Sequence, residues 1–459
     1  MIPPGDIIAA AATAWGEAAI AVVRLTGGGS AALADSLFRG ARPLSREPAR
    51  RMALGYIMDG DAAVDQVLAV RFERGASYTG EESVEIQCHG GVYAARRCLE
   101  LLKSRGARLA LPGEFTKRAF LSGRIDLAQA EAVLGVVRAR GDAELVSSGR
   151  SLQGELSLGL KKISSSLTAL RAEIEARIDF PDDVGDEEYS SYAGRVSEIS
   201  EKTASLLSRC RVGLTLANGV RVAIAGRPNA GKSSLLNAML ESDRAIVTDI
   251  PGTTRDTLDA AMIHRGMSIT LVDTAGMRDA GRARPDPIES MGVERSRAAI
   301  RGADFCVLVL DASAPLERED FEAARAAAAR PTVLAMNKRD LGIVLSDADT
   351  KELGNFMAAV ETSAPSGYGV NELKDALFEA ALGSASPYDG MMATERMVSA
   401  LGSARNCAEE AARALEEYRG ADIAGSLLSE AAEHIASLLG EDASEELLDA
   451  IFGSFCIGK

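Results

Sequence analysis

A glycine-rich segment between two apolar runs carries the clearest chemistry in the sequence. It reads G-R-P-N-A-G-K-S over residues 226–233, follows an apolar run at residues 222–225 and precedes the apolar start of an expected helix. The glycines let the loop turn its N–H groups inward, at the positive end of the helix dipole. Lys232 is expected to reach the β and γ phosphates, and the hydroxyl of Ser233 to bind Mg²⁺. The segment therefore predicts a nucleoside triphosphate site.

Three later motifs indicate the base and the phosphate contacts. The first, D-T-A-G at residues 273–276, supplies an aspartate for Mg²⁺ and a glycine N–H for the γ-phosphate. The second, N-K-R-D, ends at Asp340, whose carboxylate can accept from the ring N1–H and the exocyclic amine of guanine. Adenine has no such pair of donors. The third, T-S-A at residues 362–364, offers backbone N–H groups to the guanine O6.

These motifs share one position relative to the expected secondary structure. Each follows the carboxyl end of an apolar run that predicts a strand, and open parallel sheets bind their ligands at that edge. Their order and spacing resemble a GTPase of the Ras-like superfamily, so a doubly wound α/β domain is expected. The expected strands are residues 222–225, 268–272, 305–310, 332–336 and 357–360.

One position departs from the Ras-like pattern. Met277 follows D-T-A-G, where Ras-like enzymes carry the glutamine that orients the attacking water. A thioether cannot hold that water, and the sequence reveals no arginine finger. Hydrolysis therefore needs another residue to position water and another positive charge.

Composition limits the class of protein. A chain of 459 residues predicts two or three domains, each with its own core. Six scattered cysteines without a C-x-x-C pair favour a reducing compartment and disfavour structural zinc, and three histidines make a metal cluster unexpected. No charged leader with an apolar core and no apolar run of membrane-spanning length is visible, so a cytoplasmic protein without membrane contact is expected.

The net charge of −15 argues at first sight against a nucleic-acid partner. The charge is uneven, however: residues 1–150 carry 19 Lys and Arg against 17 Asp and Glu. If an anionic polymer such as tRNA binds, the amino-terminal third is the better candidate surface. Ordinary solvated charges explain the same count equally well.

The chain is expected to divide into four segments. Residues 1–120 are mixed α/β, with strands near 18–25, 64–72 and 83–87 and a helix near 93–102. Residues 121–216 and 383–459 are helical, and residues 217–382 form the strand-rich nucleotide domain. Since that domain is complete in itself, we infer that it is inserted into one helical domain. An apolar stripe predicts bundle core or, alternatively, a dimer seam; it comprises Leu156, Leu160, Ile163, Leu167, Leu170, Ile174 and Ile178.

Taken together, these motifs resemble the MnmE/TrmE family of tRNA-modification GTPases over the full length of the chain. The resemblance is carried by S-Y-T-G-E-E-S-V-E-I-Q-C-H-G-G, by P-G-E-F-T-K-R-A-F-L-S-G-R-I-D-L-A-Q-A-E-A, by G-R-P-N-A-G-K-S-S-L-L-N, by D-I-P-G-T-T-R-D, by D-T-A-G-M-R and by the terminal F-C-I-G-K. The architecture that it implies is a tetrahydrofolate-binding α+β domain, a split helical domain and an inserted GTPase domain.

The resemblance also implies a substitute for the arginine finger. A K⁺ ion would lie between the phosphates and the loop, held by the side chain of Asn229 and the backbone of Thr248, Ile250 and Thr253. Ser233 and Thr254 would hold Mg²⁺, and K⁺ would bring the GTPase domains of a homodimer face to face. The implied GTP-binding set is Asn229, Ala230, Gly231, Lys232, Ser233, Ser234, Thr248, Asp249, Ile250, Pro251, Gly252, Thr253, Thr254, Asp273, Thr274, Ala275, Gly276, Asn337, Lys338, Asp340, Ser363, Ala364 and Pro365.

Two catalytic residues are implied as well. Glu289, three residues before Gly292, matches the family's glutamate that positions water, although extra residues at 283–287 leave Asp286 or a plain surface role open. Cys456 matches the family's terminal cysteine. The ending Cys456-Ile457-Gly458-Lys459 fits a prenylation box poorly, and its apolar neighbours disfavour a disordered tail.

The folate site is implied by four positions, Arg24, Glu85, Arg124 and Lys459. A carboxylate can accept from pterin N–H groups and cations can hold the glutamyl carboxylates, with 5,10-methylenetetrahydrofolate or formyl-tetrahydrofolate as the one-carbon donor. Without the family, each of these residues would be an ordinary surface or paired residue.

The implied function is that of a K⁺-dependent GTPase. With an FAD-dependent partner of the MnmG/GidA type, in a heterotetramer, it would add a (carboxymethyl)aminomethyl group at C5 of the wobble uridine of certain tRNAs. A ribosome-assembly GTPase of the Era or Der type is the alternative, although neither a second G-x-x-x-x-G-K-S nor a basic tail is present. A sensor that only binds folate and nucleotide is a third possibility.

Overall fold

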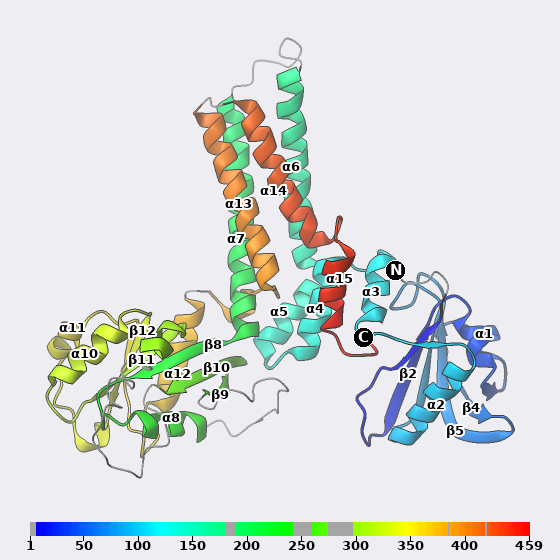
Figure 1. Ribbon diagram of the computed structural model, residues 1–459, viewed down its shortest axis with the longest axis horizontal. Helices are drawn as coiled ribbons and strands as arrows, with labels where there is room; N and C mark the ends of the chain where they lie inside the picture. Colours follow the sequence, from blue (N-terminus) through cyan, green and yellow to red (C-terminus); the bar gives the residue numbers. More distant parts are fainter. Residues whose placement is uncertain (1–5, 180–188, 242–258, 274–296, 384, 418–419) are drawn as a thin grey trace. The chain divides into compact units, whose positions relative to one another are not determined.

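The structure, a computed structural model, describes residues 6–179, 189–241, 259–273, 297–383, 385–417 and 420–459 (Figure 1). It divides into two compact units, each assembled from separate stretches of chain. The first unit comprises Met1–Leu134, Leu152–Thr203 and Ser403–Lys459, and the second comprises Gly135–Ser151 and Ala204–Gly402. The second unit therefore interrupts the first in chain order, as the insertion hypothesis requires.

The first unit begins with a seven-stranded sheet in the order β3-β4-β5-β6-β2-β1-β7. Its neighbouring strands are antiparallel, except that β1 and β7 are parallel. Helix α2 buries Ala95, Cys98 and Leu102 in the same core as Val23 and Ile86 of the central strands. The elements are β1 (Ile8–Ala11), β2 (Ile20–Thr26), α1 (Ser30–Asp35), β3 (Phe38–Gly40), η1 (Leu44–Arg46), β4 (Ala53–Asp59), β5 (Ala62–Phe72), β6 (Ser83–His89), α2 (Val92–Ser104), β7 (Arg108–Leu109) and α3 (Glu114–Leu121).

Long helices make up the rest of the first unit (Figure 1). The expected stripe lies on α6, which packs along α14, and its first six members are buried, whereas Ile178 is exposed. Those six residues are therefore bundle core within one chain. The helices are α4 (Leu127–Arg138), α5 (Asp142–Leu152), α6 (Glu155–Asp179), α7 (Tyr189–Asn218), α13 (Glu395–Glu416), α14 (Ala421–Leu439) and α15 (Glu445–Gly453), of which α4, α7 and α13 run from one unit into the other, and α5 lies in the second unit apart from its last residue.

The second unit is built on a six-stranded sheet in the order β13-β12-β11-β8-β10-β9. Strands β13, β12, β11, β8 and β10 are parallel, and β9 is antiparallel to β10. The side chains of β8 alternate between the two faces: Val222 and Ile224 pack with α8 and α12, and Ala223 and Ala225 pack with α10. The elements are β8 (Val220–Ala225), α8 (Lys232–Glu241), β9 (Asp259–His264), β10 (Met267–Asp273), β11 (Phe305–Asp311), α10 (Arg318–Ala327), β12 (Thr332–Asn337), η2 (Arg339–Leu341), α11 (Asp347–Leu353), β13 (Ala358–Glu361), α12 (Val370–Leu382) and η3 (Pro387–Asp389).

The fold class expected from the sequence is confirmed: a doubly wound GTPase-type domain lies within a helical domain and follows an α+β domain. The division at residues 120, 216 and 382 stays a prediction. Among the described residues, none of the helices combines the length and apolarity that crossing a membrane requires.

Candidate nucleotide site and amino-terminal polar site

The phosphate loop connects β8 to α8 at the carboxyl edge of the parallel sheet. Gly226, Asn229 and Gly231 have φ values of 148°, 62° and 97°, so the loop needs left-handed backbone at three of its positions. Helix α8 begins at Lys232, whose ammonium donates to the carbonyls of Gly226 and Arg227, both at 2.8 Å. Because this lysine folds back over its own loop, its charge lies where the sequence predicted phosphates.

Asn337 joins the phosphate loop to the predicted guanine loop. Its buried side chain donates from Nδ2 to the Ala230 carbonyl at 3.0 Å, and its Oδ1 accepts from the N–H of Ala364 at 3.3 Å. A Cβ at Gly231 would overlap that same Nδ2, so this position requires glycine. These two hydrogen bonds, called the Asn337 clasp below, hold together two loops that are more than a hundred residues apart in the sequence.

The predicted base-binding residues are brought together beside this clasp. Asp340 is exposed, and its Oδ1 accepts from the hydroxyl of Ser363 at 2.7 Å. The N–H of Ser363 donates to the Tyr368 carbonyl at 2.9 Å, and Pro365 has no N–H. The Ala364 N–H, whose bond to Asn337 Oδ1 is longer at 3.3 Å, is therefore the better candidate of these N–H groups to approach guanine O6.

A group of charged side chains links the phosphate loop to the guanine motif, and the sequence assigned only Lys338 among its members. Asp311 accepts from Lys338 Nζ at 2.7 Å and lies 3.8 Å from Arg227, which also contacts Glu317 and Asp320 at 3.0 and 3.3 Å. Burial alone would raise the pKa of Asp311, but the bonds from Lys338 and Ser313 outweigh it and lower that pKa. Asp311 therefore stays ionised and fixes Lys338. The only signal in the sequence was its position at the end of an expected strand.

Part of the predicted nucleotide and metal set falls outside the described residues. Asp273 ends β10 in register with Ile224 of β8, so its backbone is at the expected sheet edge. Asn229, Ser233 and Ser234 are on the loop and the first turn of α8, where all three are exposed. Outside the described residues lie Thr248, Asp249, Ile250, Pro251, Gly252, Thr253, Thr254, Thr274, Ala275, Gly276, Met277, Asp286 and Glu289.

In the amino-terminal sheet, two predicted folate residues form an ion pair. Arg24 and Glu85 are cross-strand partners on β2 and β6, with Nη2 of Arg24 2.8 Å and Nε 2.9 Å from Oε1 of Glu85. The guanidinium lies over the rings of Tyr78 and Phe115, at 5.4 and 5.7 Å from their centroids. Burial raises the pKa of Tyr78 despite the bond to Thr116 and the nearby Arg24 charge, so its phenol stays protonated. The pair thus lies beside two aromatic rings.

The chain terminus meets this site through its backbone. Phe115 N–H donates to the Lys459 carbonyl at 3.2 Å, and Gly113 N–H donates to the carbonyl of the exposed Cys456 at 3.4 Å. Lys459 therefore lies beside the residue whose ring contacts Arg24. Arg124 is exposed just after α3, and its backbone N–H donates to the Ala119 carbonyl. Within the described part of the chain, no hydrogen bond or ion pair joins it to the other three predicted folate residues.

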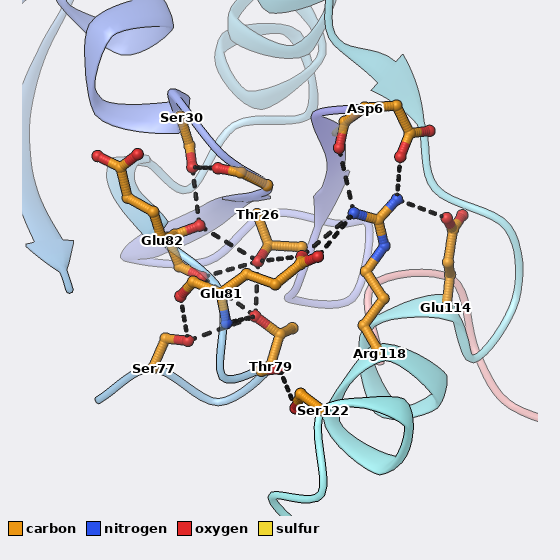
Figure 2. A network of polar contacts seen from close by, with 12 residues as sticks. Asp6, Thr26, Ser30, Ser77, Thr79, Glu81, Glu82, Glu114, Arg118 and Ser122 are labelled. Carbon is orange, nitrogen blue, oxygen red and sulfur yellow. Dashed lines mark hydrogen bonds and ion pairs between the residues drawn. The ribbon is translucent and has the colours of Figure 1, made fainter. Parts of the chain in front are cut away.

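Behind the ion pair, a polar network holds the loop of residues 77–83 against α3 (Figure 2). Arg118, only 4% exposed, pairs with Asp6 at 2.5 Å, Glu114 at 3.0 Å and Glu81 at 3.1 Å, and Arg108 bridges Asp6 and Glu114. The loop is also tied to β2, because the hydroxyl of Thr79 lies 2.6 Å from that of Thr26, the last residue of the strand. Since Tyr78 lies on this loop and Phe115 on α3, the network sets the spacing of the rings around Arg24.

Comparisons with known proteins match the chain from end to end. A family model described as "GTP-binding protein TrmE N-terminus" matches residues 7–124, and one described as "MnmE helical domain" matches residues 127–456. A "tRNA modification GTPase MnmE" of Moorella thermoacetica is 39% identical over 99% of this chain and 99% of its own length.

Further relatives of the same name agree. The protein of a Synechococcus strain is 39% identical over 100% of this chain and 99% of its own length, and that of Chloroflexus aurantiacus is 40% identical over 99% of this chain and its own full length. With full-length identity on this scale, and both family models matched in order, the chain belongs to the MnmE family of tRNA modification GTPases.

Proposed function

We propose that this chain hydrolyses GTP and uses it in the modification of the wobble uridine of tRNA. The observation that carries the proposal is the meeting of the phosphate loop and the guanine motif at one sheet edge, clasped by Asn337. The full-length match to tRNA modification GTPases favours this function over ribosome assembly.

In the nucleotide site, each described residue has a role that its position supports. Lys232 exchanges two loop carbonyls for β and γ phosphate oxygens, and Asp340 accepts from the guanine N–H donors. The Ser233 hydroxyl and the Asn229 amide fit the oxygen ligands that Mg²⁺ and K⁺ require. Bound there, the two cations would neutralise charge on the phosphates, as an arginine finger does elsewhere. Thr254 would complete the Mg²⁺ set, and Thr248, Ile250 and Thr253 would complete the K⁺ set.

Water positioning is assigned to Glu289, because Met277 cannot perform it. Glu289 would orient the attacking water in a homodimer whose GTPase domains meet when K⁺ is present. Hydrolysis would then drive opening and closing of the dimer rather than the carbon chemistry itself.

The amino-terminal polar site suits a reduced folate. Glu85 can accept from pterin N–H groups, the rings of Tyr78 and Phe115 offer flat apolar surfaces, and Lys459 can meet a glutamyl carboxylate. We therefore assign the one-carbon donor, 5,10-methylenetetrahydrofolate or its formyl counterpart, to this site, with Cys456 and Arg124 at its edge. An FAD-dependent protein of the MnmG/GidA type would be the partner in the cytoplasm.

A surface for tRNA phosphates is available on the same sheet domain. Residues 39–51 carry five arginines and a single acid, Glu47. Arg39, Arg42, Arg46 and Arg51 are exposed, and their guanidinium groups pair with no acid among the residues that the structure describes. Because unpaired arginines can neutralise phosphates and release counterions, we assign the tRNA backbone to this segment.

The test of the proposed function is the rate of GTP hydrolysis in K⁺, in Na⁺ and without a monovalent cation, at several protein concentrations. We expect turnover that K⁺ stimulates and Na⁺ does not, with a rate per chain that rises with concentration. Asn229→Ala should abolish the stimulation and keep GTP binding, whereas Lys232→Ala should lose binding. Equal rates in K⁺ and Na⁺ would reject the potassium site, and a chain that hydrolyses no GTP in any salt would overturn the proposal.

A further inference from the structure

Two helices of the first unit bring together three side chains that ligate metals. Cys407 is on α13, and Glu430 and His434 are on α14; their ligand atoms all lie within 4.8 Å of one another. Glu430 and His434 are four residues apart, so they share one face of α14, with His434 Nε2 3.8 Å from Glu430 Oε1. From these positions we propose that Cys407, Glu430 and His434 form a binding site for a divalent transition-metal ion of the zinc type.

The donor set selects this class of metal. Thiolate, imidazole and carboxylate are the ligands of zinc sites, whereas Mg²⁺ and Ca²⁺ take oxygen ligands. Around a tetrahedral zinc ion, a thiolate sulfur and an imidazole nitrogen lie about 3.6 Å apart. The present separations, none above 4.8 Å, must therefore shrink by about 1 Å at most, which the side chain of Glu430, 60% exposed, and that of His434, 34% exposed, can achieve by rotation.

The local charge also favours a cation. The carboxylates of Glu430 and of Glu410, the latter one turn further along α13, both lie near the Cys407 thiol. Their negative charges would attract a divalent ion, which would hold the sulfur as a thiolate. Water can then complete the coordination.

This site could not be predicted from the sequence, because its ligands come from two helices and are not close together in the chain. The spacing of cysteines and histidines disfavoured a metal cluster, yet the segment E-A-A-E-H at residues 430–434 already places two donors on one helical face. A metal there would cross-link α13 to α14 and so stabilise their packing in the second helical half of the chain.

The test is titration of the full-length protein with Co²⁺, then Zn²⁺, in excess Mg²⁺ and a thiol-free reductant. The background is Cys456→Ser, which removes the exposed terminal thiol. We expect one Co²⁺ per chain, a thiolate-to-cobalt charge-transfer band, and displacement by Zn²⁺. Cys407→Ser and His434→Gln should each weaken binding by at least about 100-fold, and folding of these variants is checked by circular dichroism.

A matched control distinguishes this site from general histidine binding. His89→Gln removes another histidine that contacts a carboxylate, that of Asp65 at 2.6 Å, and it should leave the titration unchanged. No charge-transfer band, or binding that survives both Cys407→Ser and His434→Gln, would overturn the site.

Discussion

In the proposed nucleotide site, we expect Asp340 to decide which base is accepted. Asp340→Asn should lower the affinity for GTP by about 100-fold and raise that for xanthosine triphosphate, because each hydrogen bond to a charged group contributes about 1.5–3 kcal/mol and an amide can donate to the xanthine C2 carbonyl. The measurement is competitive nucleotide binding. Ser363→Ala, which removes the hydroxyl donor to Asp340, is the control and should show no preference for xanthine. Equal loss of both nucleotides in Asp340→Asn would place Asp340 away from the base.

The buried Glu114 should be worth far more to stability than an exposed carboxylate. Its side chain is 3% exposed and accepts from Arg108 and Arg118, so Glu114→Gln should cost about 3 kcal/mol by leaving buried guanidinium groups underpaired. The measurement is unfolding followed by the fluorescence of Trp15, the single tryptophan of the chain. Glu100→Gln, which removes an exposed partner of Arg96 and Arg97, should leave the transition nearly unchanged.

The difference in stability between the wild type and Glu114→Gln should depend on pH, and the pKa of Glu114 gives the direction of that dependence. Burial alone would raise the pKa of Glu114, but the bonds from Arg108, from the Leu111 N–H and from Arg118 lower it below its ordinary value of 4.5. The stabilisation is therefore complete above about pH 4.5 and is lost as the pH falls through the lowered pKa. The gap between wild type and Glu114→Gln should narrow in that acidic range, and a gap that widens there would contradict the charged network.

At the residue scale, the sequence predicted the candidate functional residues better than it predicted the contacts that position them. Lys232 and Asp340 could be assigned because their spacing within a strand–loop–helix pattern fixes their position. The Asn337 clasp, the Asp311–Lys338 bond and the Arg118 network could not, because each depends on contacts between residues distant in sequence.

At the scale of elements, the apolar strands of the parallel sheet were predictable, whereas several antiparallel or short strands were not. Buried runs such as β11 and β12 have no polar positions to obscure them, because helices cover both faces of a parallel sheet. Five strands were missed: β1, β3, β4, β7 and β9. Strand β4 mixes exposed and buried positions, β3, β7 and β9 lie at sheet edges, and β1 is only four residues long. The first helical segment expected, residues 121–216, is divided into α4, α5, α6 and α7, with Gly154, at φ 89°, just before α6.

The packing of the terminal segment, residues 456–459, against β1 can be tested by a substitution that adds a single methyl group. Gly458 has φ 96°, and a Cβ there would overlap the carbonyl oxygen of Ala11 on β1. Gly458→Ala should therefore release the segment, at a cost of about 1–3 kcal/mol, and weaken binding of a reduced folate. Gly453→Ala adds its methyl where no atom lies within 4 Å and serves as the control.

The readouts are folate affinity and the rate of carboxypeptidase trimming. Faster trimming and weaker folate binding in Gly458→Ala, with Gly453→Ala unchanged, would support a terminus that completes the amino-terminal polar site. Faster trimming with unaltered folate affinity would show that Lys459 does not contribute to folate binding at that site.

At the scale of the whole molecule, a chain with a net charge of −15 must meet an anionic polymer through a local basic surface. Arg42→Glu combined with Arg46→Glu should weaken tRNA binding and reduce the slope of log affinity against log salt by about two, one for each phosphate that an arginine no longer neutralises. Filter binding over a salt series measures both. The same double change at Arg301 and Arg318, exposed arginines of the other unit, is the control. An unchanged slope of log affinity against log salt would show that tRNA does not bind to this segment.

The most direct measurement of the central claim is mass spectrometry of tRNA nucleosides from cells that lack this chain. We predict wobble uridines without the C5 substituent, restoration by the wild-type chain, and no restoration by Lys232→Ala, because the modification depends on GTP bound at the phosphate loop. Wobble uridines that keep their substituent in the absence of the chain would contradict the account.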